Sequence, residues 1–522
     1  AFGRKENKME LFHNQITKAQ GIASVRSLYR SNSLYFLAEN VSCPVTVLDF
    51  PSRKRFIREL RENKYDAVGI SFITPNFLKA REMARLVREI RPEAEIILGG
   101  HGAAIENIEE SIPCDHVVKG EGIGWLRKYL GEDSSKPIVH PLLPTAEFRM
   151  TFGIPSGSYY RRKGSKGKSL GAMLVPGVGC VNGCRFCATS HFFGKAYTSF
   201  FPDGESLFRE MCRLGDALNT NEIAVQDENF LKDRQRALDL LECLEKGKRP
   251  FCLNIFSSAE AIAAFGVENM ARLGVVSVWI GAESKLDAYE KNQGRDLKAL
   301  IQELHRFGIR VIVSGILFVE HHDKKTIQDD IDYLIDLEGD FTQFMQLIPF
   351  PVTALYEDYK AKGWLDFDLP YEDWHGQDKL IFTPPHFSRA EAREILDQAF
   401  KSEFDRLSSS MYRLSSTTLK GAKTLTAYPT DPWMAIRRDQ LRAQSKLLRA
   451  LIPTLRRNAH NPLERDRIEQ LNQDYFEVLG KTPISTRALG FAAVLLSEAF
   501  KWRIRFFGDR LQPRTIHQKY RQ

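Results

Sequence analysis

Residues 177–187 have the sequence GVGCVNGCRFC, and they follow an apolar run, Ala172–Val175, that predicts a strand. The three cysteines of the stretch, Cys180, Cys184 and Cys187, are spaced C-x₃-C-x₂-C. Cysteine sulfur is the standard protein ligand of iron–sulfur clusters, and the glycines let the backbone wrap closely around a bulky group. Since no fourth cysteine lies nearby in the sequence, one iron of a four-iron cluster would stay open to another ligand.

This stretch resembles the cluster-binding loop of radical S-adenosylmethionine enzymes, in which Phe186, the aromatic residue before the last cysteine, also fits. The resemblance implies a 4Fe–4S cluster on the three cysteines, with S-adenosylmethionine chelating the open iron. It also implies cleavage to a 5′-deoxyadenosyl radical by one electron, and a reductant such as flavodoxin or ferredoxin. The alternative, a structural zinc loop, is disfavoured because zinc in such sites takes four protein ligands.

The composition is that of an ordinary globular protein. A length of 522 residues predicts two to four domains, and 43% hydrophobic residues are enough for large cores. No run reaches the roughly 20 apolar residues of a membrane span, and the polar stretch Ala1–Glu10 shows no signal peptide. The chain has eight cysteines, and those outside the central three are scattered along the sequence. This pattern excludes a disulfide framework and favours a cytoplasmic location.

Strand and helix patterns alternate in the N-terminal part of the chain. The predicted strands are Val45–Phe50, Ala67–Phe72 and Glu95–Gly99, and the predicted helices are Tyr35–Glu39, Ser52–Asn63 and Asn76–Glu89. Such alternation predicts a parallel, doubly wound sheet. In such sheets ligands bind at the carboxyl ends of the strands.

Residues 30–130 resemble the cobalamin-binding domain that precedes many radical S-adenosylmethionine cores. The resemblance implies that five residues contact the corrin and its nucleotide tail: Ser71, Thr74, Gly99, Gly100 and Gly120. Two features depart from the family. No D-x-H-x-x-G motif supplies an axial histidine, so His101 is interpreted as a loop histidine, and the usual first strand is not evident before Ser33. A Rossmann-like domain that no longer binds cobalamin therefore stays an alternative.

The segment after the cysteine stretch predicts the catalytic core. Further strands are predicted at residues 222–226, 252–256, 276–281, 310–318 and 343–348, and helices at Asp203–Leu218, Asp233–Lys246, Ala259–Leu273, Asp296–Phe307 and Lys325–Asp336. With the strand before the cysteines, six units fit the partial (β/α)₆ barrel that the resemblance implies. Active residues of such barrels lie at the carboxyl ends of strands.

Polar residues are present at these strand ends. Asp227 lies in a D-x-N-F stretch after the second strand, and Glu283 lies in a G-x-E-S stretch after the fourth. The resemblance implies that these two, with Ser314 on the fifth strand and Phe186, bind S-adenosylmethionine, since carboxylates accept hydrogen bonds from ammonium or hydroxyl groups. Surface-loop carboxylates are the alternative. The turn His321–Asp323 is interpreted as solvated rather than as a metal site, and residues that exchange hydrogen with the substrate are not identified.

The C-terminal region is mainly helical by pattern and basic. Residues 431–522 carry 18 Lys and Arg against 9 Asp and Glu, while the whole chain has a net charge of +8. The apolar stretch Ala488–Phe507 ends in several basic and aromatic residues, which is typical of a helix in a membrane interface. A helix packed on the barrel is the alternative, and the absence of a recognisable RNA-binding motif disfavours nucleic acid as a partner.

The sequence therefore predicts an α/β enzyme of four parts: a cobalamin-binding-type Rossmann-like domain (1–150), a basic linker (151–170), a radical S-adenosylmethionine partial barrel (171–365) and a helical C-terminal domain (366–522). Its predicted reaction is cobalamin-dependent C-methylation of a small apolar or lipid-like substrate, in which hydrogen abstraction from an unactivated carbon is followed by methyl transfer. Cobalamin-independent coupling, cyclisation or rearrangement is an alternative, and so is a non-catalytic cobalamin or iron–sulfur sensor. A tRNA methylthiolating enzyme would carry a second cysteine triplet, but the N-terminal part has Cys43 and Cys114 alone.

Overall fold

The computed structural model describes residues 15–16, 19–21, 25–28, 30–145, 147–150, 171–285, 296–377, 379–507 and 515–521. The polar N-terminal stretch and the basic linker expected at 151–170 lie outside the described residues.

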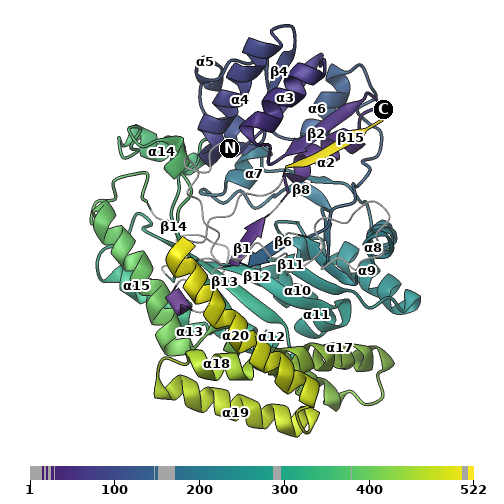
Figure 1. Ribbon diagram of the computed structural model, residues 1–522, viewed down its shortest axis with the longest axis vertical. Helices are drawn as coiled ribbons and strands as arrows, with labels where there is room; N and C mark the ends of the chain where they lie inside the picture. The colour runs from purple at the N-terminus through teal and green to yellow at the C-terminus, as the bar shows by residue number, and fades with distance from the viewer. Residues whose placement is uncertain are drawn as a thin grey trace.

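The N-terminal domain alternates helices and strands as the sequence predicts (Figure 1). Its elements are α2 (Asn32–Glu39), β2 (Val45–Asp49), α3 (Arg53–Glu62), β3 (Ala67–Ser71), α4 (Phe77–Ile90), β4 (Glu95–Gly99), β5 (His116–Val117) and α6 (Gly122–Tyr129). Strands β3, β4 and β5 form a parallel sheet. Buried Phe56, Leu60 and Val87 of α3 and α4 share one core with this sheet, so the carboxyl ends of its strands meet at one edge.

Strand β2 has a partner that the sequence did not predict, the C-terminal strand β15 (Ile516–Tyr520), which pairs with it antiparallel. The early strand β1 (Val25–Leu28) pairs antiparallel with β6 (Glu147–Met150). Among the described residues, no strand before Ser33 therefore joins a parallel sheet, in agreement with the first strand that the sequence pattern lacks.

The central domain is a six-stranded parallel sheet in the order β14-β13-β12-β11-β10-β7, which confirms the predicted partial barrel. Its strands are β7 (Ala172–Leu174), β10 (Glu222–Val225), β11 (Cys252–Phe256), β12 (Val275–Glu283), β13 (Arg310–Leu317) and β14 (Phe341–Gln346). The helices are α8 (Gly204–Leu218), α9 (Arg234–Gly247), α10 (Ala259–Phe265), α11 (Val267–Leu273), α12 (Leu297–Arg306) and α13 (Thr326–Asp336). The helix predicted over 259–273 is two helices, because Gly266 has a φ of +91° that ends the first one.

The cysteine stretch leaves the barrel as a small hairpin after β7. Strand β8 (Gly177–Gly179) pairs antiparallel with β9 (Tyr197–Ser199), and the short helix α7 (Ala188–Phe192) lies between them. The hairpin places the cysteines at the carboxyl end of the first barrel strand.

Helices make up most of the C-terminal region. They are α14 (Ala354–Ala361), α15 (Arg389–Leu407), α16 (Ser410–Thr424), α17 (Pro432–Leu448), α18 (Ile452–Asn458), α19 (Pro462–Leu479) and α20 (Ile484–Phe507). Figure 1 shows α18, α19 and α20 at the end of the molecule opposite the N-terminal domain, whereas β15 lies beside β2. The last residues of the chain thus return to its first domain.

Candidate active site

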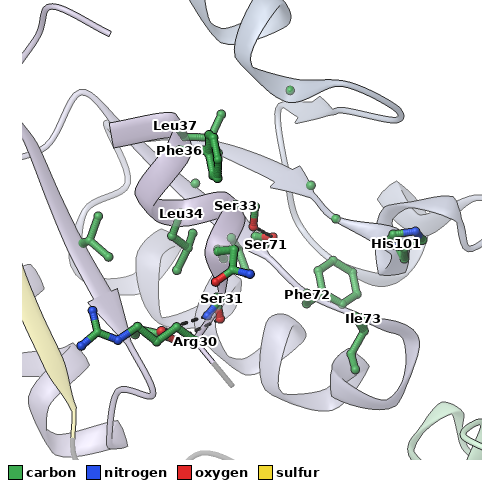
Figure 2. Close-up of a pocket in the computed structure, with 18 of the residues that line it drawn as sticks. Arg30, Ser31, Ser33, Leu34, Phe36, Leu37, Ser71, Phe72, Ile73 and His101 are labelled. Atoms are coloured by element: carbon green, nitrogen blue, oxygen red, sulfur yellow. Dashed lines mark hydrogen bonds between the residues drawn. The ribbon is translucent and has the colours of Figure 1, made fainter. Parts of the chain in front are cut away.

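A cavity of about 2030 Å³ lies between the N-terminal domain and the barrel. Ordinary small-molecule sites occupy about 300–1,000 Å³, so this one has room for a large cofactor together with a second ligand. Its wall combines strand-end loops of the N-terminal domain, the hairpin residues Gly177–Gly179 and one face of α15. Figure 2 shows part of the N-terminal wall, where Ser33 and Ser71 face each other with 3.2 Å between their hydroxyl oxygens.

Most of the predicted cobalamin contacts lie on this wall. The lining residues among them are Ser71, Gly99, Gly100 and Gly120. Thr74 is buried at the start of a short 3₁₀ helix and is not part of the described wall. Gly100 has a φ of +79°, and a Cβ there would lie 2.6 Å from the Phe72 carbonyl oxygen. Because only glycine fits this turn, bare backbone borders the cavity, and such a surface suits close approach by a large ligand.

His101 connects the two domains at the cavity. Its ring stacks on Phe192 of α7 with 4.6 Å between the ring centroids, and it lines the cavity. Burial lowers the pKa of His101, and its Nε2 has no hydrogen-bond partner in the described structure. The neutral ring therefore offers one polar nitrogen in an otherwise apolar contact.

Hydrogen bonds to backbone groups fix the conformation of the cysteine loop. Ser190 Oγ donates to the Cys180 carbonyl oxygen at 2.7 Å and accepts the Gly183 N–H at 3.0 Å. The Cys187 N–H donates to the Cys184 carbonyl oxygen at 3.0 Å. The loop shape is thus set by the chain itself, as a preorganised ligand loop requires.

The three thiols fit the donor chemistry of an iron–sulfur cluster. Burial, together with the nearby charges of Glu228, Cys184 and Cys180, raises the pKa of the Cys187 thiol to about 11. The three thiols come from one short loop. Within the described ranges, no three His, Cys, Asp or Glu side chains are already grouped as a metal site, so the fit rests on residue type and on the shared loop.

Asp227 is buried in an ion pair. Its Oδ2 accepts hydrogen bonds from Arg236 Nη2 at 3.0 Å and from the Tyr197 hydroxyl at 2.7 Å, and both charged side chains are only 3% exposed. Tyr197 belongs to β9, so its hydrogen bond to Asp227 of the ion pair fastens the cysteine hairpin to the end of β10. The carboxylate already has partners within the chain, and its contact with S-adenosylmethionine stays a prediction.

The other residues predicted to bind S-adenosylmethionine lie close to the strand ends. Glu283 is buried at the end of β12, where β12 bulges against β13, and has a φ of +60°. Such a conformation is costly for a non-glycine residue and is concentrated at ligand sites. Ser314 Oγ donates to Gln343 Oε1 at 3.1 Å, and Phe186 packs against the barrel core. Neither Glu283 nor Ser314 belongs to the cavity wall in the described ranges.

The turn at His321–Asp323 is exposed at His321 and Asp323, as the sequence predicted, but His322 differs from the prediction. His322 is buried, and its Nδ1 accepts two backbone N–H groups at the end of β13, at 2.9 and 3.2 Å. Its Nε2 lies 2.9 Å from Asp330 Oδ2. The ring is buried because it satisfies these polar groups, which makes it a structural residue, while Asp323 accepts backbone N–H groups in the first turn of α13.

Comparison with known proteins identifies one domain, in the N-terminal part of the chain. Residues 32–128 match the B12-binding domain family. An uncharacterised methyltransferase of Pyrococcus horikoshii is 22% identical over 65% of this chain and 79% of its own. The bacteriochlorophyllide d C-12(1)-methyltransferase of Chlorobaculum tepidum is 24% identical over 60% and 69%. The anaerobic magnesium-protoporphyrin IX monomethyl ester cyclase of Cereibacter sphaeroides is 21% identical over 60% and 56%.

The N-terminal part of the chain is a B12-binding domain. This match agrees with the predicted cobalamin, whereas the 4Fe–4S cluster and S-adenosyl-L-methionine stay predictions from the cysteine spacing and the strand-end residues. Among solved structures, the radical S-adenosylmethionine methyltransferase TsrM of Kitasatospora setae is similar, with a TM-score of 0.47 and 16% identity over 75% of this chain and 90% of that one.

The structure adds residues to the candidate site that the sequence did not single out. Gln226 and Glu228 line the cavity, whereas Asp227 between them points to the hairpin. Strand β10 ends at Val225 and Glu228 lies in the turn that follows, so the alternation of side chains along a strand does not predict which of these residues face the cavity. No local signal marks Lys401 on α15 or Lys519 on β15, which also line the cavity.

Proposed function

We propose that this enzyme methylates an unactivated carbon of a small apolar or lipid-like substrate, beginning with hydrogen abstraction. When bound, the cluster and S-adenosylmethionine supply the 5′-deoxyadenosyl radical, and cobalamin carries the methyl group. The observation that supports the proposal is the shared cavity, because the B12-binding loops line the same space as Gly177–Gly179, which lead into the cysteine loop, and Phe192, which follows it. Cys180, Cys184 and Cys187 themselves are not among the lining residues. Two cofactors that face one space can act on one substrate without releasing it.

The residues of the chain have separate roles in this proposal. The cysteine loop holds the cluster, and the Asp227–Arg236 ion pair keeps the hairpin in position. Glu228, exposed at the wall, offers a charged acceptor to the ammonium group of S-adenosylmethionine, and Glu283 is proposed to accept from its ribose or amino acid part. Phe193 and Phe200 give the wall apolar surface that excludes water from the reacting groups.

The names of relatives support a small-molecule substrate. TsrM has been solved with tryptophan as its substrate, and the Chlorobaculum enzyme acts on bacteriochlorophyllide d by its name. The relationship to a cyclase keeps ring formation as a second candidate reaction. A non-catalytic sensor is disfavoured, because the named relatives are enzymes.

We also propose that the enzyme works in the cytoplasm at the membrane surface, through an apolar stripe on α20. The stripe consists of Ile484, Phe491, Leu495, Trp502 and Phe506, which are 56–84% exposed. Their spacings of seven, four, seven and four residues place them on one face of the helix, opposite Gly490, which packs on α18. In the described part of the chain, no helix is long and apolar enough to cross a bilayer.

Anionic lipid fits this surface better than a protein partner because the whole C-terminal region is basic. Each basic residue near an anionic bilayer contributes about 1 kcal/mol. Vesicle co-sedimentation at low salt tests the proposal, with Phe491→Ser/Leu495→Ser as the variant and Leu447→Ser, an exposed leucine on α17, as the control. Wild-type protein that stays in the supernatant with anionic vesicles would contradict membrane binding.

The proposed reaction is tested by anaerobic reconstitution with iron, sulfide and cobalamin, followed by reduction with flavodoxin or ferredoxin. The expected products are 5′-deoxyadenosine and, with S-adenosylmethionine labelled in its methyl group, a labelled apolar product from a lipid extract. The Cys180→Ala variant is the control and should give neither. A wild-type enzyme that forms 5′-deoxyadenosine but transfers no label to any substrate would favour ring formation or rearrangement instead.

A further inference from the structure

The last strand of the chain is built into the first domain. Thr515 Oγ1 donates to the Phe50 carbonyl oxygen at 3.0 Å and accepts the Ser52 N–H at 3.2 Å. At the other end of β15, Arg521 Nη2 donates to the Glu39 carbonyl oxygen at 2.8 Å. The strand is therefore held at both ends as well as by its pairing with β2 (Figure 1).

A buried carboxylate ties β15 to α3 and to the start of β3. Glu59 is 4% exposed, and its carboxylate accepts the Tyr65 hydroxyl at 2.8 Å and lies 3.2 Å from His517 Nε2. Burial pushes the pKa of Glu59 up, but the hydrogen bonds from Tyr65 and His517 outweigh it and hold the pKa below its usual value. Loss of β15 would remove one of the groups that stabilise this buried charge.

The cavity runs along the same strand. Its wall includes Thr46 of β2 and both Lys519 and Tyr520 of β15, and Lys519 lies opposite Thr46 in the strand pairing. Lys64, just before β3, also lines it. Both lysines are exposed, and in the described structure neither has an ion-pair partner. The wall also carries carboxylates, among them Glu59 and Asp66. Two ammonium groups without an ion-pair partner still give this part of the wall donors for an anionic ligand group.

We infer that residues 515–521 are part of the corrinoid-binding site, where β15 holds the β2 side of the cavity and Lys519 attracts the phosphodiester of the nucleotide tail. Within the described sheets, β15 is the one partner of β2, and an isolated strand does not keep its place. The inference rests on the proposed use of cobalamin and adds to it a segment far outside the matched B12-binding residues 32–128.

The test is titration of the apo protein with hydroxocobalamin, followed by absorbance, with four proteins: the full chain, a chain that ends at residue 514, Lys519→Glu and Lys519→Arg. We expect at least a tenfold weaker affinity for the shortened chain. Lys519→Glu should weaken binding about threefold or more at low salt and less at high salt, since it reverses an exposed charge. Lys519→Arg and the control Gln518→Ala, which is outside the cavity wall, should bind as the full chain does.

A peptide of residues 515–522 added in trans should restore binding to the shortened chain by strand addition. That recovery would separate a local role of β15 from general misfolding. Equal affinity of the full and shortened chains would overturn the inference, and if the shortened chain does not fold, equal affinity of Lys519→Glu and Lys519→Arg would overturn the lysine assignment. Failure of the full chain itself to bind cobalamin would instead contradict the proposed function.

Discussion

Asp227 and Glu228 follow β10, and the structure places the first in a buried ion pair and the second on the cavity wall. Two matched substitutions test this placement. Asp227→Asn removes the charge that faces Arg236 in a buried pair, whereas Glu228→Gln removes an equal charge from the exposed cavity wall. Each change keeps the size of the side chain. The structure predicts opposite outcomes: the first variant should lose stability, and the second should lose affinity for S-adenosylmethionine.

The magnitudes follow from burial. Removing one partner of a buried ion pair costs about 3–5 kcal/mol, because the other charge stays buried without compensation. That is a roughly 100-fold or larger fall in the ratio of folded to unfolded protein. Glu228→Gln should change the free energy of unfolding by less than about 0.5 kcal/mol. Loss of a charge-assisted hydrogen bond, worth about 1.5–3 kcal/mol, should lower its affinity for S-adenosylmethionine about tenfold or more.

The assays are urea unfolding of the apo proteins and anaerobic calorimetry with S-adenosylmethionine after cluster reconstitution. The double variant Asp227→Asn/Arg236→Met is the control, since it removes both charges and should recover part of the lost stability. An Asp227→Asn protein with normal stability but weak cofactor binding would refute the reasoning. In that case Asp227 would contact the cofactor directly, as the sequence alone suggested.

Four further predictions concern the cofactors and the acid range. Changing Cys180, Cys184 and Cys187 together to Ala should remove the bound iron and the brown chromophore, and iron that remains after the triple change would contradict the cluster assignment. Glu283→Gln should weaken S-adenosylmethionine binding about tenfold or more without loss of the cluster, because it removes a charged acceptor, and unchanged affinity in calorimetry would argue against its role. Cob(II)alamin on the protein should show no imidazole nitrogen coupling in electron paramagnetic resonance, and such coupling would identify His101 or another histidine as an axial ligand. Burial lowers the pKa of His140 to about 4, so its contribution to stability is complete above its unfolded pKa of about 6.5 and should be lost as the pH falls towards 4, a loss that His140→Gln should reduce in thermal unfolding at several pH values.

The elements that the sequence predicted are those with a strong local pattern. The alternation of apolar strands and amphipathic helices placed the barrel strands within a few residues, and Asp203 caps α8 through the N–H of Ser206 as expected for an N-cap. The cysteine spacing pointed to the cluster loop because its ligands are close in sequence. Local sequence patterns predict these helices, strands and loops because neighbouring residues largely determine the backbone conformation.

The roles of single side chains depended on partners that are distant in sequence. Asp227 was predicted to bind S-adenosylmethionine, which stays a prediction, but the sequence did not show that Tyr197 and Arg236, from two other elements, donate to its carboxylate. His322 was predicted to be solvated, but it is buried because two backbone N–H groups and Asp330 satisfy its ring. A sequence window shows the residue type and not these partners, so the direction in which a polar side chain points could not be predicted.

The N-terminal domain also depends on a partner that is distant in sequence and that the sequence did not predict. Its helices and strands were predicted within residues 30–130, but β2 obtains its strand partner from residues 516–520. Pairing over such a separation forms late in folding, since the loop entropy must be overcome before the contact is gained. Residues 516–520 therefore complete the β2 side of the domain. The proposed role of β15 makes cofactor retention depend on this segment as well as on the matched residues 32–128.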